Sequence, residues 1–235
     1  MNSIEFLGRI VSVGESSFHT CSSLPSITFS EGLTSIGESV FQLCANLKSF
    51  VAPNSLTSMG IRAFIECERM TSFEMSETLS ISVLEVYLFA YCRMLSSITI
   101  PKRVETIKIG TFMNCGLRSI VFPEKVTIIE DEICSGCYYL QSITFLGSVT
   151  SIGYNSFYQC SNLKSIEIPN SVTFINRAFC ECSILENVYF SGLSSPENVS
   201  DIFEEKCEKE QEIKQNNAND ISDSDNDDSD IDFWL

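Results

Sequence analysis

Hydrophobic and polar positions alternate over short stretches that recur along most of the chain. In LKSIEI (163–168), Ile166 and Ile168 fall on one side of an extended chain while Ser165 and Glu167 fall on the other. This alternation predicts a short strand with one buried face. Pro169 has no amide donor, so we expect the strand to end there, and the following SVTFI predicts a second short strand.

The same pattern returns every 22 to 25 residues. A phenylalanine followed three residues later by a cysteine marks each unit: Phe18/Cys21, Phe41/Cys44, Phe64/Cys67, Phe89/Cys92, Phe112/Cys115, Phe157/Cys160 and Phe179/Cys182, with Cys134/Cys137 between the fifth and sixth pairs. A serine and a large apolar residue precede each unit: Ser3-Ile4, Ser26-Ile27, Ser49-Phe50, Ser72-Phe73, Ser97-Ile98, Ser119-Ile120, Ser142-Ile143 and Ser165-Ile166. A ninth unit starts at Asn187-Val188 and is not completed. The repeat therefore predicts a β-rich solenoid of about eight coils.

One such coil cannot bury its own apolar face, so neighbouring coils must cover it. At about 4.8 Å per coil, eight stacked coils form a rod on the order of 40 Å long with continuous internal ladders. One ladder comprises Phe6, Phe29, Ala52, Met75, Ile100, Phe122, Phe145, Ile168 and Phe190. We expect each coil to hold two short strands and one helical or 3₁₀ turn, and the fourth coil to bulge because it has two extra residues within LSISVLEVYLF (79–89).

Four glycines, Gly14, Gly37, Gly60 and Gly153, stand where each coil must turn, and we expect positive φ there. GLTSIGES (32–39) nearly matches the phosphate-binding loop G-x-x-x-x-G-K-[ST], with Glu38 in place of the lysine. The same repeat position reads RVETIKIG (103–110) and SVTSIGYN (148–155) in other coils. Gly37 is therefore assigned to the turn and Glu38 to the surface, and no phosphate site is expected.

These units resemble the BspA-like leucine-rich repeat family, with the form L-x-S-I-x-I-P-x-S-V-T-x-I-G-x-x-A-F-x-x-C-x-x-L. The resemblance covers roughly residues 3–190 and is clearest in LSSITIPKRVETI (95–107), LQSITFLGSVTSIGYNSFYQCSNL (140–163) and LKSIEIPNSVTFINRAFCECSIL (163–185). It implies a leucine-rich repeat solenoid and a role of the kind associated with surface antigens, adhesion and host-protein binding. The sixth coil departs from the family pattern because it lacks the phenylalanine.

Eight cysteines hold one repeat position, Cys21, Cys44, Cys67, Cys92, Cys115, Cys137, Cys160 and Cys182, where buried free thiols are expected as core filler. A zinc site built from Cys134, Cys137, Cys180 and Cys182 would need thiolates from coils six and eight to converge across coil seven, which tetrahedral coordination does not allow. His19 is the single histidine and is expected at the surface. With no nucleophile paired to a base, we expect no enzyme, no cofactor and no metal.

The outward positions of the first strands are the candidate partner-binding face: Glu5, Thr28, Val51, Glu74, Thr99, Val121, Thr144 and Glu167. Solenoids use such rows as extended binding surfaces, although a solvated sheet face is the alternative interpretation. Tyr138, Tyr139, Tyr154 and Tyr158 form either an exposed aromatic patch or partly buried turn packing. We expect a monomer with protein partners.

Charge changes abruptly near the end of the repeat. The chain carries 15 Lys and Arg against 31 Asp and Glu, a net of −16, of which residues 200–235 hold thirteen carboxylates and three lysines. We therefore divide the chain into a solenoid over 1–195, a charged cap or linker over 196–214 for which a helix is one alternative, and an acidic disordered tail over 215–235. Ser222, Ser224 and Ser229 have the spacing of acidic-directed phosphorylation sites, and Phe233, Trp234 and Leu235 form a candidate docking motif in DIDFWL.

Two functions remain open. An acidic chain disfavours nucleic acid, and no apolar run reaches the ~18 residues of a membrane span. The leading hypothesis is a non-enzymatic protein-binding or adhesion protein. The alternative is an intracellular scaffold or regulator that binds basic partners through its acidic tail. The start of the sequence shows no signal peptide, which favours the cytoplasm, whereas the family resemblance favours the cell surface.

Overall fold

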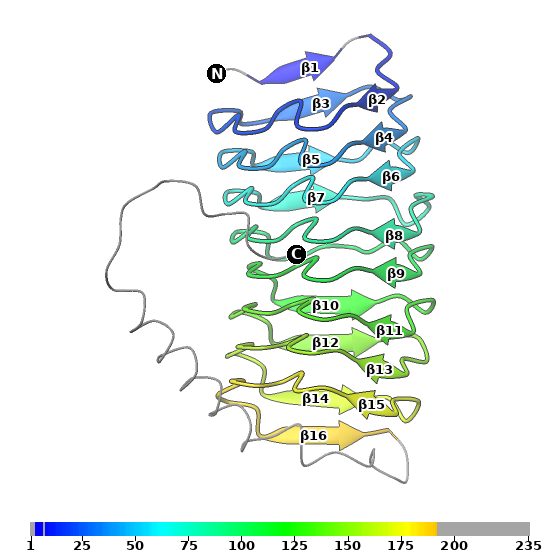
Figure 1. Cartoon of the computed structure of the whole chain (residues 1–235), viewed down its shortest axis with the longest axis vertical. Helices are drawn as coiled ribbons and strands as arrows, with labels where there is room; N and C mark the ends of the chain where they lie inside the picture. The colour runs from blue at the N-terminus through cyan, green and yellow to red at the C-terminus, as the bar shows by residue number, and fades with distance from the viewer. Residues whose placement is uncertain (1–2, 7, 192–235) are drawn as a thin grey trace, which may run out of the picture. The chain divides into compact units, whose positions relative to one another are not determined.

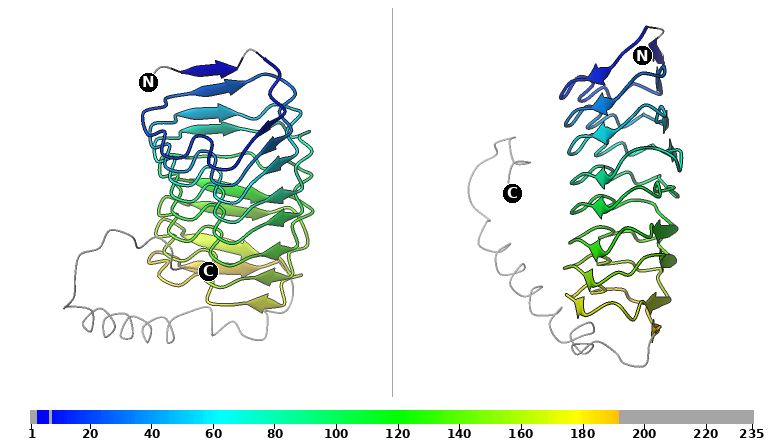
Figure 2. Two further views of the ribbon diagram at one scale, coloured as in Figure 1. Left: turned by 45° about the horizontal axis from the view of Figure 1, so that its top comes forward. Right: turned by 90° about the vertical axis from the view of Figure 1, so that its right-hand side faces the viewer.

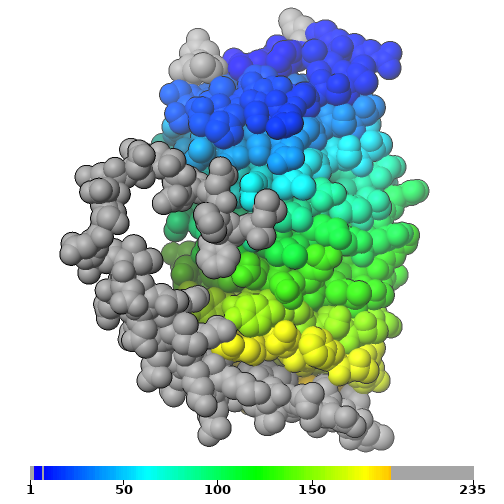
Figure 3. Space-filling view, in the orientation of Figure 1, coloured from blue at the N-terminus to red at the C-terminus, as the bar shows by residue number. Residues whose placement is uncertain are grey.

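The repeat folds into a β-solenoid of eight coils, which a computed structural model describes over residues 3–6 and 8–191. The coils begin at residues 3, 26, 49, 72, 97, 119, 142 and 165, and are called coils one to eight below. They stack in sequence order, each directly below the one before (Figure 1). In the space-filling view, successive coils appear as parallel bands across the surface (Figure 3).

The strands form two columns on separate sides of the solenoid (Figures 1 and 2). The first column contains β1 (Ile4–Phe6), β3 (Ile27–Phe29), β5 (Ser49–Val51), β7 (Ser72–Glu74), β10 (Ser119–Phe122), β12 (Ser142–Phe145), β14 (Ser165–Ile168) and β16 (Asn187–Phe190). The second contains β2 (Ser12–Val13), β4 (Ser35–Ile36), β6 (Ser58–Met59), β8 (Val83–Leu84), β9 (Thr106–Ile107), β11 (Ile128–Ile129), β13 (Ser151–Ile152) and β15 (Phe174–Ile175). The strand pairings among the described residues are parallel and join repeat-equivalent residues, such as Ile120 with Ile143.

Stacked phenylalanines fill the interior. The rings of Phe41 and Phe64 lie 5.0 Å apart and nearly parallel, and those of Phe89 and Phe112 lie 5.8 Å apart. The stack is broken at coil six, where Cys134 replaces the ring as the sequence predicts, and it resumes in Phe157. Because these side chains are almost completely buried, each coil depends on its neighbours for its core.

The repeat cysteines pack in this core and also make hydrogen bonds. The Cys67 thiol donates to the carbonyl oxygen of Phe41 at 3.3 Å, and the Cys115 thiol to that of Phe89 at 3.0 Å. The same bond recurs at Cys44, Cys92, Cys137, Cys160 and Cys182, always to a carbonyl of the preceding coil. The prediction of buried thiols is confirmed for most of the ladder. These thiols fill space in the core and also donate hydrogen bonds that join neighbouring coils.

The turn after the second strand is not helical, so that expectation is wrong: the described residues contain no helix. Instead each coil has two residues, four apart, in the left-handed region with φ between 47° and 70°. In coil one these are Ser16 and Thr20, whose amides donate to the carbonyls of Glu38 and Gln42 in coil two. The left-handed conformation costs energy for residues with a side chain, and the hydrogen bond that it directs to the next coil offsets this cost.

The turn glycines do not have positive φ, which corrects the prediction for Gly14, Gly37, Gly60 and Gly153. Crowding explains three of them. A Cβ on Gly37 would lie 2.8 Å from the Glu15 nitrogen, one on Gly60 2.5 Å from the Glu38 nitrogen, and one on Gly153 2.9 Å from the Asp131 nitrogen. These glycines let neighbouring coils approach closely, and the left-handed positions lie a few residues further on.

The first column is interrupted at coil five. Residues 97–100 read as a strand in the sequence, but the structure has no strand there, and β7 is followed in this column by β10. The loop between β7 and β8 has eight residues, whereas the loop between β5 and β6 has six, so the expected insertion lies just before this break. Coil five nevertheless keeps its register with coil four in the second column, where Val83 pairs with Thr106 and Leu84 with Ile107.

Candidate partner-binding face

All eight predicted residues of the outward row are exposed on the first column. Those that lie in paired strands stand at one register, as the pairings of Glu5 with Thr28, Val51 with Glu74, and Val121 with Thr144 demonstrate. Thr99 holds the same repeat position in the unpaired segment of coil five. Tyr189 continues the row on β16 by pairing with Glu167 and is 57% exposed. The prediction omitted Tyr189, although its place in the ninth, incomplete unit already gave it the same repeat position.

The row is held rigidly because its neighbours along each strand are buried. Val51 is 61% exposed, whereas Phe50 and Ala52 on either side of it are buried. This gives a fixed column of mixed apolar, hydroxyl and acidic side chains, about 4.8 Å apart within the paired parts. Such a surface can contact a protein over several coils at little cost in conformational entropy.

The second column offers fewer free hydroxyl groups. The hydroxyl groups of Thr34, Thr57, Thr150 and Thr173 each donate to a backbone carbonyl of the preceding coil, at 2.9 to 3.3 Å. These donors join successive coils and are not available to a ligand. The first column is therefore the better candidate face.

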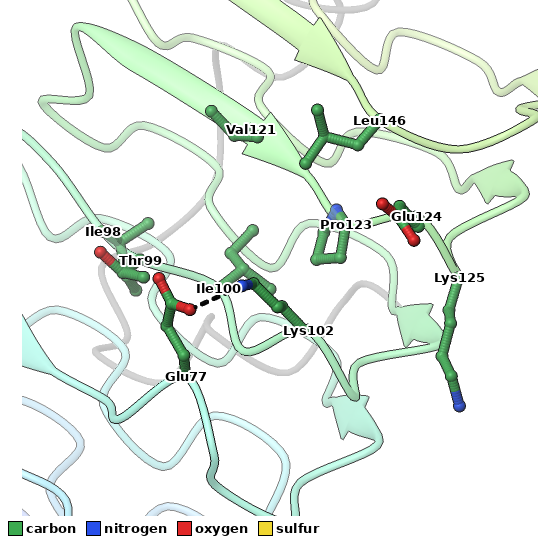
Figure 4. A pocket seen from close by; sticks show the side chains of 10 residues that line it. All are labelled: Glu77, Ile98, Thr99, Ile100, Lys102, Val121, Pro123, Glu124, Lys125 and Leu146. Carbon is green, nitrogen blue, oxygen red and sulfur yellow. Dashed lines mark ion pairs between the residues drawn. The ribbon is translucent and has the colours of Figure 1, made fainter.

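A groove of about 450 Å³ opens beside the break in the first column (Figure 4). Val121 of β10 and Leu146, which follows β12, lie next to each other on its wall and are 46% and 57% exposed. The other apolar lining residues are Ile98, Ile100 and Pro123. The groove thus combines a mainly apolar lining with part of the predicted row, because Thr99 and Val121 belong to both.

Charged side chains form the rim of this groove. The Lys102 ammonium group lies 2.9 Å from a Glu77 carboxylate oxygen, and this hydrogen bond raises the pKa of Lys102. Lys125 pairs with Glu105 of coil five, and Glu124 lies beside it on the rim. All of these groups are exposed, so water screens each pair and leaves it weak.

The tyrosine cluster divides between the two interpretations. Tyr138 and Tyr139 are exposed, whereas Tyr154 and Tyr158 are half-buried in the turns. The Tyr138 hydroxyl donates to Gln159 at 3.2 Å, and the Arg177 guanidinium lies 5.6 Å from the centre of the Tyr154 ring. Burial raises the pKa of Tyr158 to about 12. Only the first two tyrosines present free aromatic surface.

The segment GLTSIGES (32–39), which nearly matches a phosphate-binding loop, uses its backbone amides in hydrogen bonds between coils. The Gly37 amide donates to Val13 at 2.9 Å, and the Ser39 amide donates to Ile61 at 2.9 Å. Glu38 is exposed, as the sequence predicts. Amides that join coils cannot also surround a phosphate, so this segment serves the solenoid.

The sulfur and histidine side chains show no catalytic arrangement in the part of the chain that the structure describes. His19 is exposed, whereas Cys134 and Cys137 are buried and Cys180 is buried in coil eight. Burial raises the pKa of Cys44 and Cys92 to about 12, which keeps these thiols protonated and unreactive. Within residues 3–6 and 8–191, no three His, Cys, Asp or Glu side chains gather as metal ligands would.

Several predictions lie outside the described residues. These are the domain boundaries at 195 and 214, the disordered tail, the phosphorylation sites Ser222, Ser224 and Ser229, and the motif Phe233, Trp234 and Leu235. They stay predictions. Of the residues that are described, none belongs to a helix long and apolar enough to cross a membrane.

Comparison with known proteins agrees with this architecture. A family model described as the BspA type leucine rich repeat region matches six copies over residues 1–115 and 82–209. A search of curated proteins found no similar sequence.

Solved structures also resemble the solenoid. A leucine-rich repeat protein of T. pallidum is 22% identical over 68% of this chain and 81% of its own, with a TM-score of 0.60. A leucine-rich cell surface protein of Faecalibacterium prausnitzii is 27% identical over 82% of this chain and 60% of its own, with a TM-score of 0.55. The pneumococcal vaccine antigen PcpA is 17% identical over 80% of this chain and 62% of its own, with a TM-score of 0.56. The chain therefore spans less than two thirds of the length of the last two proteins.

Proposed function

Because the chain belongs to the BspA-type leucine-rich repeat family, we propose that it is a non-enzymatic, adhesion-type protein that binds a protein partner through the exposed row of its first column. The observation that carries this proposal is the row itself. Eight predicted side chains and Tyr189 stand exposed at the same repeat position of successive coils. Leucine-rich repeat proteins typically use such extended surfaces to bind other proteins.

Display at a cell surface is part of the proposal. Two of the similar structures are described as a cell surface protein and as a vaccine antigen. Their likeness to this chain supports the same setting for it. Labelling of intact cells with a membrane-impermeant reagent should modify the protein, and labelling only after lysis would contradict this part.

A binding role is also favoured by the chemistry of the described residues. The thiols that could act as nucleophiles are mostly buried with raised pKa, and the only histidine is exposed on a turn. Covalent or acid–base catalysis needs converging reactive groups in a cleft. The groove beside coil five is instead lined by apolar residues, lysines and exposed carboxylates.

Site-specific photo-crosslinking tests the proposed face. A photoreactive phenylalanine analogue replaces Thr144 in the row of the first column, and the matched control carries it at Thr127 beside the second column. Both positions are exposed threonines. The proposal predicts a crosslinked protein from Thr144 and none from Thr127. Equal crosslinking from both positions, or none from any row position, would refute it.

The second candidate is a scaffold that binds basic partners through the acidic tail. Residues 200–235 follow the last complete repeat unit and carry a net charge of −10, which favours this candidate. Removal of residues 196–235 separates the two candidates: partner binding should survive under the leading proposal and be lost under the alternative.

A further inference from the structure

The cysteine ladder contains a pair of thiols, from neighbouring coils, that contact each other. Cys160 of coil seven and Cys182 of coil eight hold the same repeat position, and their side chains are hydrogen-bonded. We infer that these two residues form an oxidation site, at which hydrogen peroxide oxidises Cys182 and Cys160 then closes a disulfide that joins coils seven and eight. This inference goes beyond the proposed binding function and does not depend on it.

Cys182 is the member of the pair that an oxidant can reach. Its side chain is half-buried, whereas that of Cys160 is completely buried. Cys134 and Cys137 also share a hydrogen bond between their thiols, but both are completely buried. The pair of Cys160 and Cys182 therefore combines contact between two thiols with access for a small oxidant.

The surroundings of the Cys182 sulfur favour its thiolate, which is the form that reacts with peroxide. The thiol and the backbone amide of Cys160 both donate hydrogen bonds to this sulfur, and the bond from the thiol is the main cause of the lowered pKa of Cys182. Burial raises the pKa of Cys160, so this thiol stays protonated. The pair thus holds one nucleophile and one thiol that keeps its proton until the first has been oxidised.

The two steps together need only peroxide. The Cys182 thiolate attacks one peroxide oxygen, the O–O bond breaks, and hydroxide leaves while Cys182 becomes a sulfenic acid. The Cys160 sulfur then attacks the Cys182 sulfur, the S–O bond breaks, and the hydroxyl group leaves as water with the proton from Cys160. The two sulfurs lose two electrons in all, which reduce the peroxide, and the product is one disulfide.

The backbone holds the two cysteines at a separation that a disulfide can bridge. Just before the pair, the Gln159 amide donates to the Cys180 carbonyl at 2.9 Å. Just after it, the Glu186 amide donates to the Lys164 carbonyl at 3.0 Å. Coils joined in this way lie about 4.8 Å apart, within the ~4.4–6.8 Å between Cα atoms in disulfides. Cys180 is itself disulfide-bonded, so it offers no free thiol that would compete.

The opposite end of the ladder provides an internal control. Cys21 in coil one is half-buried like Cys182, and Cys44 in coil two is buried. The Cys44 thiol donates to the Phe18 carbonyl at 3.1 Å and receives a hydrogen bond from the Cys21 backbone, with no bond between these two described thiols. Peroxide can therefore reach both ends of the ladder, whereas a neighbouring thiol is in contact at only one of them.

Peroxide treatment of the full-length protein, as purified, tests this inference. After oxidation, the remaining thiols are alkylated with iodoacetamide, and the chain is digested with chymotrypsin without reduction. Tandem mass spectrometry then identifies peptides that a disulfide joins. Cleavage after Tyr158 separates Cys160 from Cys134 and Cys137, so the bridge can be assigned.

Two serine variants give the comparison. Cys160→Ser removes the thiol that closes the bridge, and the matched control is Cys44→Ser, at the same repeat position beside Cys21. Serine keeps a hydroxyl donor in place of the thiol at both positions, and circular dichroism checks that both variants retain the fold. Dimedone, which traps sulfenic acids, reports on oxidised cysteines that have not formed a disulfide.

The expected result is a disulfide between Cys160 and Cys182 in the wild-type protein and in Cys44→Ser, and its complete loss in Cys160→Ser. In Cys160→Ser the sulfenic acid on Cys182 should persist, so dimedone should label it. At the other end, dimedone should label Cys21 of the wild-type protein, with no disulfide to Cys44.

Absence of the bridge between Cys160 and Cys182 in the oxidised wild-type protein would overturn the inference, and this result does not require either variant to fold. A bridge of equal yield between Cys21 and Cys44, or a bridge from Cys182 to any other cysteine, would also overturn it. Crosslinking from Thr144 is measured without peroxide, so failure of this inference leaves the proposed function in place.

Discussion

The thiol of Cys92 donates a hydrogen bond to the carbonyl oxygen of Phe64 in the preceding coil, with 3.3 Å between sulfur and oxygen. The equivalent residues, Cys67 and Cys115, make the same contact one coil before and one coil after. A cysteine at this repeat position therefore fills the core and joins two coils at once. Its conversion to alanine should remove both effects.

We expect Cys92→Ala to lower the free energy of unfolding by about 1–3 kcal/mol, from the lost packing and the unsatisfied carbonyl. Urea denaturation measures the change. The matched control is Cys21→Ala, at the same repeat position in the first coil, where the side chain is only half-buried. An equal loss in the two variants would contradict the role assigned to the ladder.

Alkaline pH should destabilise the solenoid. Burial raises the pKa of Cys44 and Cys92 from 9.0 to about 12. Below pH 9 both thiols are protonated in the folded and unfolded states, so they do not affect stability. Between pH 9 and about 12 only the unfolded chain ionises them, so the free energy of unfolding falls, by up to about 1.4 kcal/mol per pH unit for each thiol.

Denaturation at several pH values between about 8 and 11 measures this slope. Tyrosine and lysine also titrate in this range, so the comparison is with Cys92→Ala, which should show a shallower slope. An identical slope in the variant would show that the buried thiol does not contribute.

The thiols should differ in reactivity along the ladder. Cys21 and Cys182 are half-buried, and a hydrogen bond from Cys160 lowers the pKa of Cys182. Cys67, Cys92 and Cys115 are buried with raised pKa. Iodoacetamide should therefore modify the two half-buried thiols first, as peptide mapping by mass spectrometry can show. Early modification of Cys92 in the native protein would contradict the stacked arrangement.

Much of this architecture could be predicted from the sequence. The spacing of phenylalanine and cysteine gave the number of coils, and alternation in segments such as SIEI (165–168) gave the strands and the outward row. The residues in the left-handed conformation could not be predicted in this way, because they are of different types, among them Ser16, Arg62 and Tyr87. Hydrogen bonds to the next coil select it, and these exist only once the coils are stacked.

The groove could not be predicted for a related reason. SSITI (96–100) alternates as well as any strand in the chain. The structure nevertheless has no strand there, and the longer connection between β7 and β8 lies in the coil before it. Local patterning reports the tendency of a segment to be extended, whereas pairing depends on the register of the coil before it.

The turn glycines provide a further test of close stacking. A Cβ on Gly60 would lie 2.5 Å from the Glu38 nitrogen, which is backbone and cannot rotate away. We expect Gly60→Ala to destabilise the protein by about 1–3 kcal/mol in thermal or urea unfolding. Gly8 has no atom within 4 Å of an added Cβ, so Gly8→Ala should be neutral or slightly stabilising. Equal effects at the two positions would show that the coils are less tightly packed than described.

The central claim is that this solenoid recognises a protein through its first column. The most direct measurement is the affinity of the crosslinked partner, once isolated, for Thr144→Arg and Thr127→Arg variants of the full-length chain. Both substitutions place the same long cation at an exposed threonine, one on the row and one beside the second column. The account predicts that Thr144→Arg weakens binding by about tenfold or more while Thr127→Arg leaves it within about twofold. Equal affinities for the two variants would contradict it.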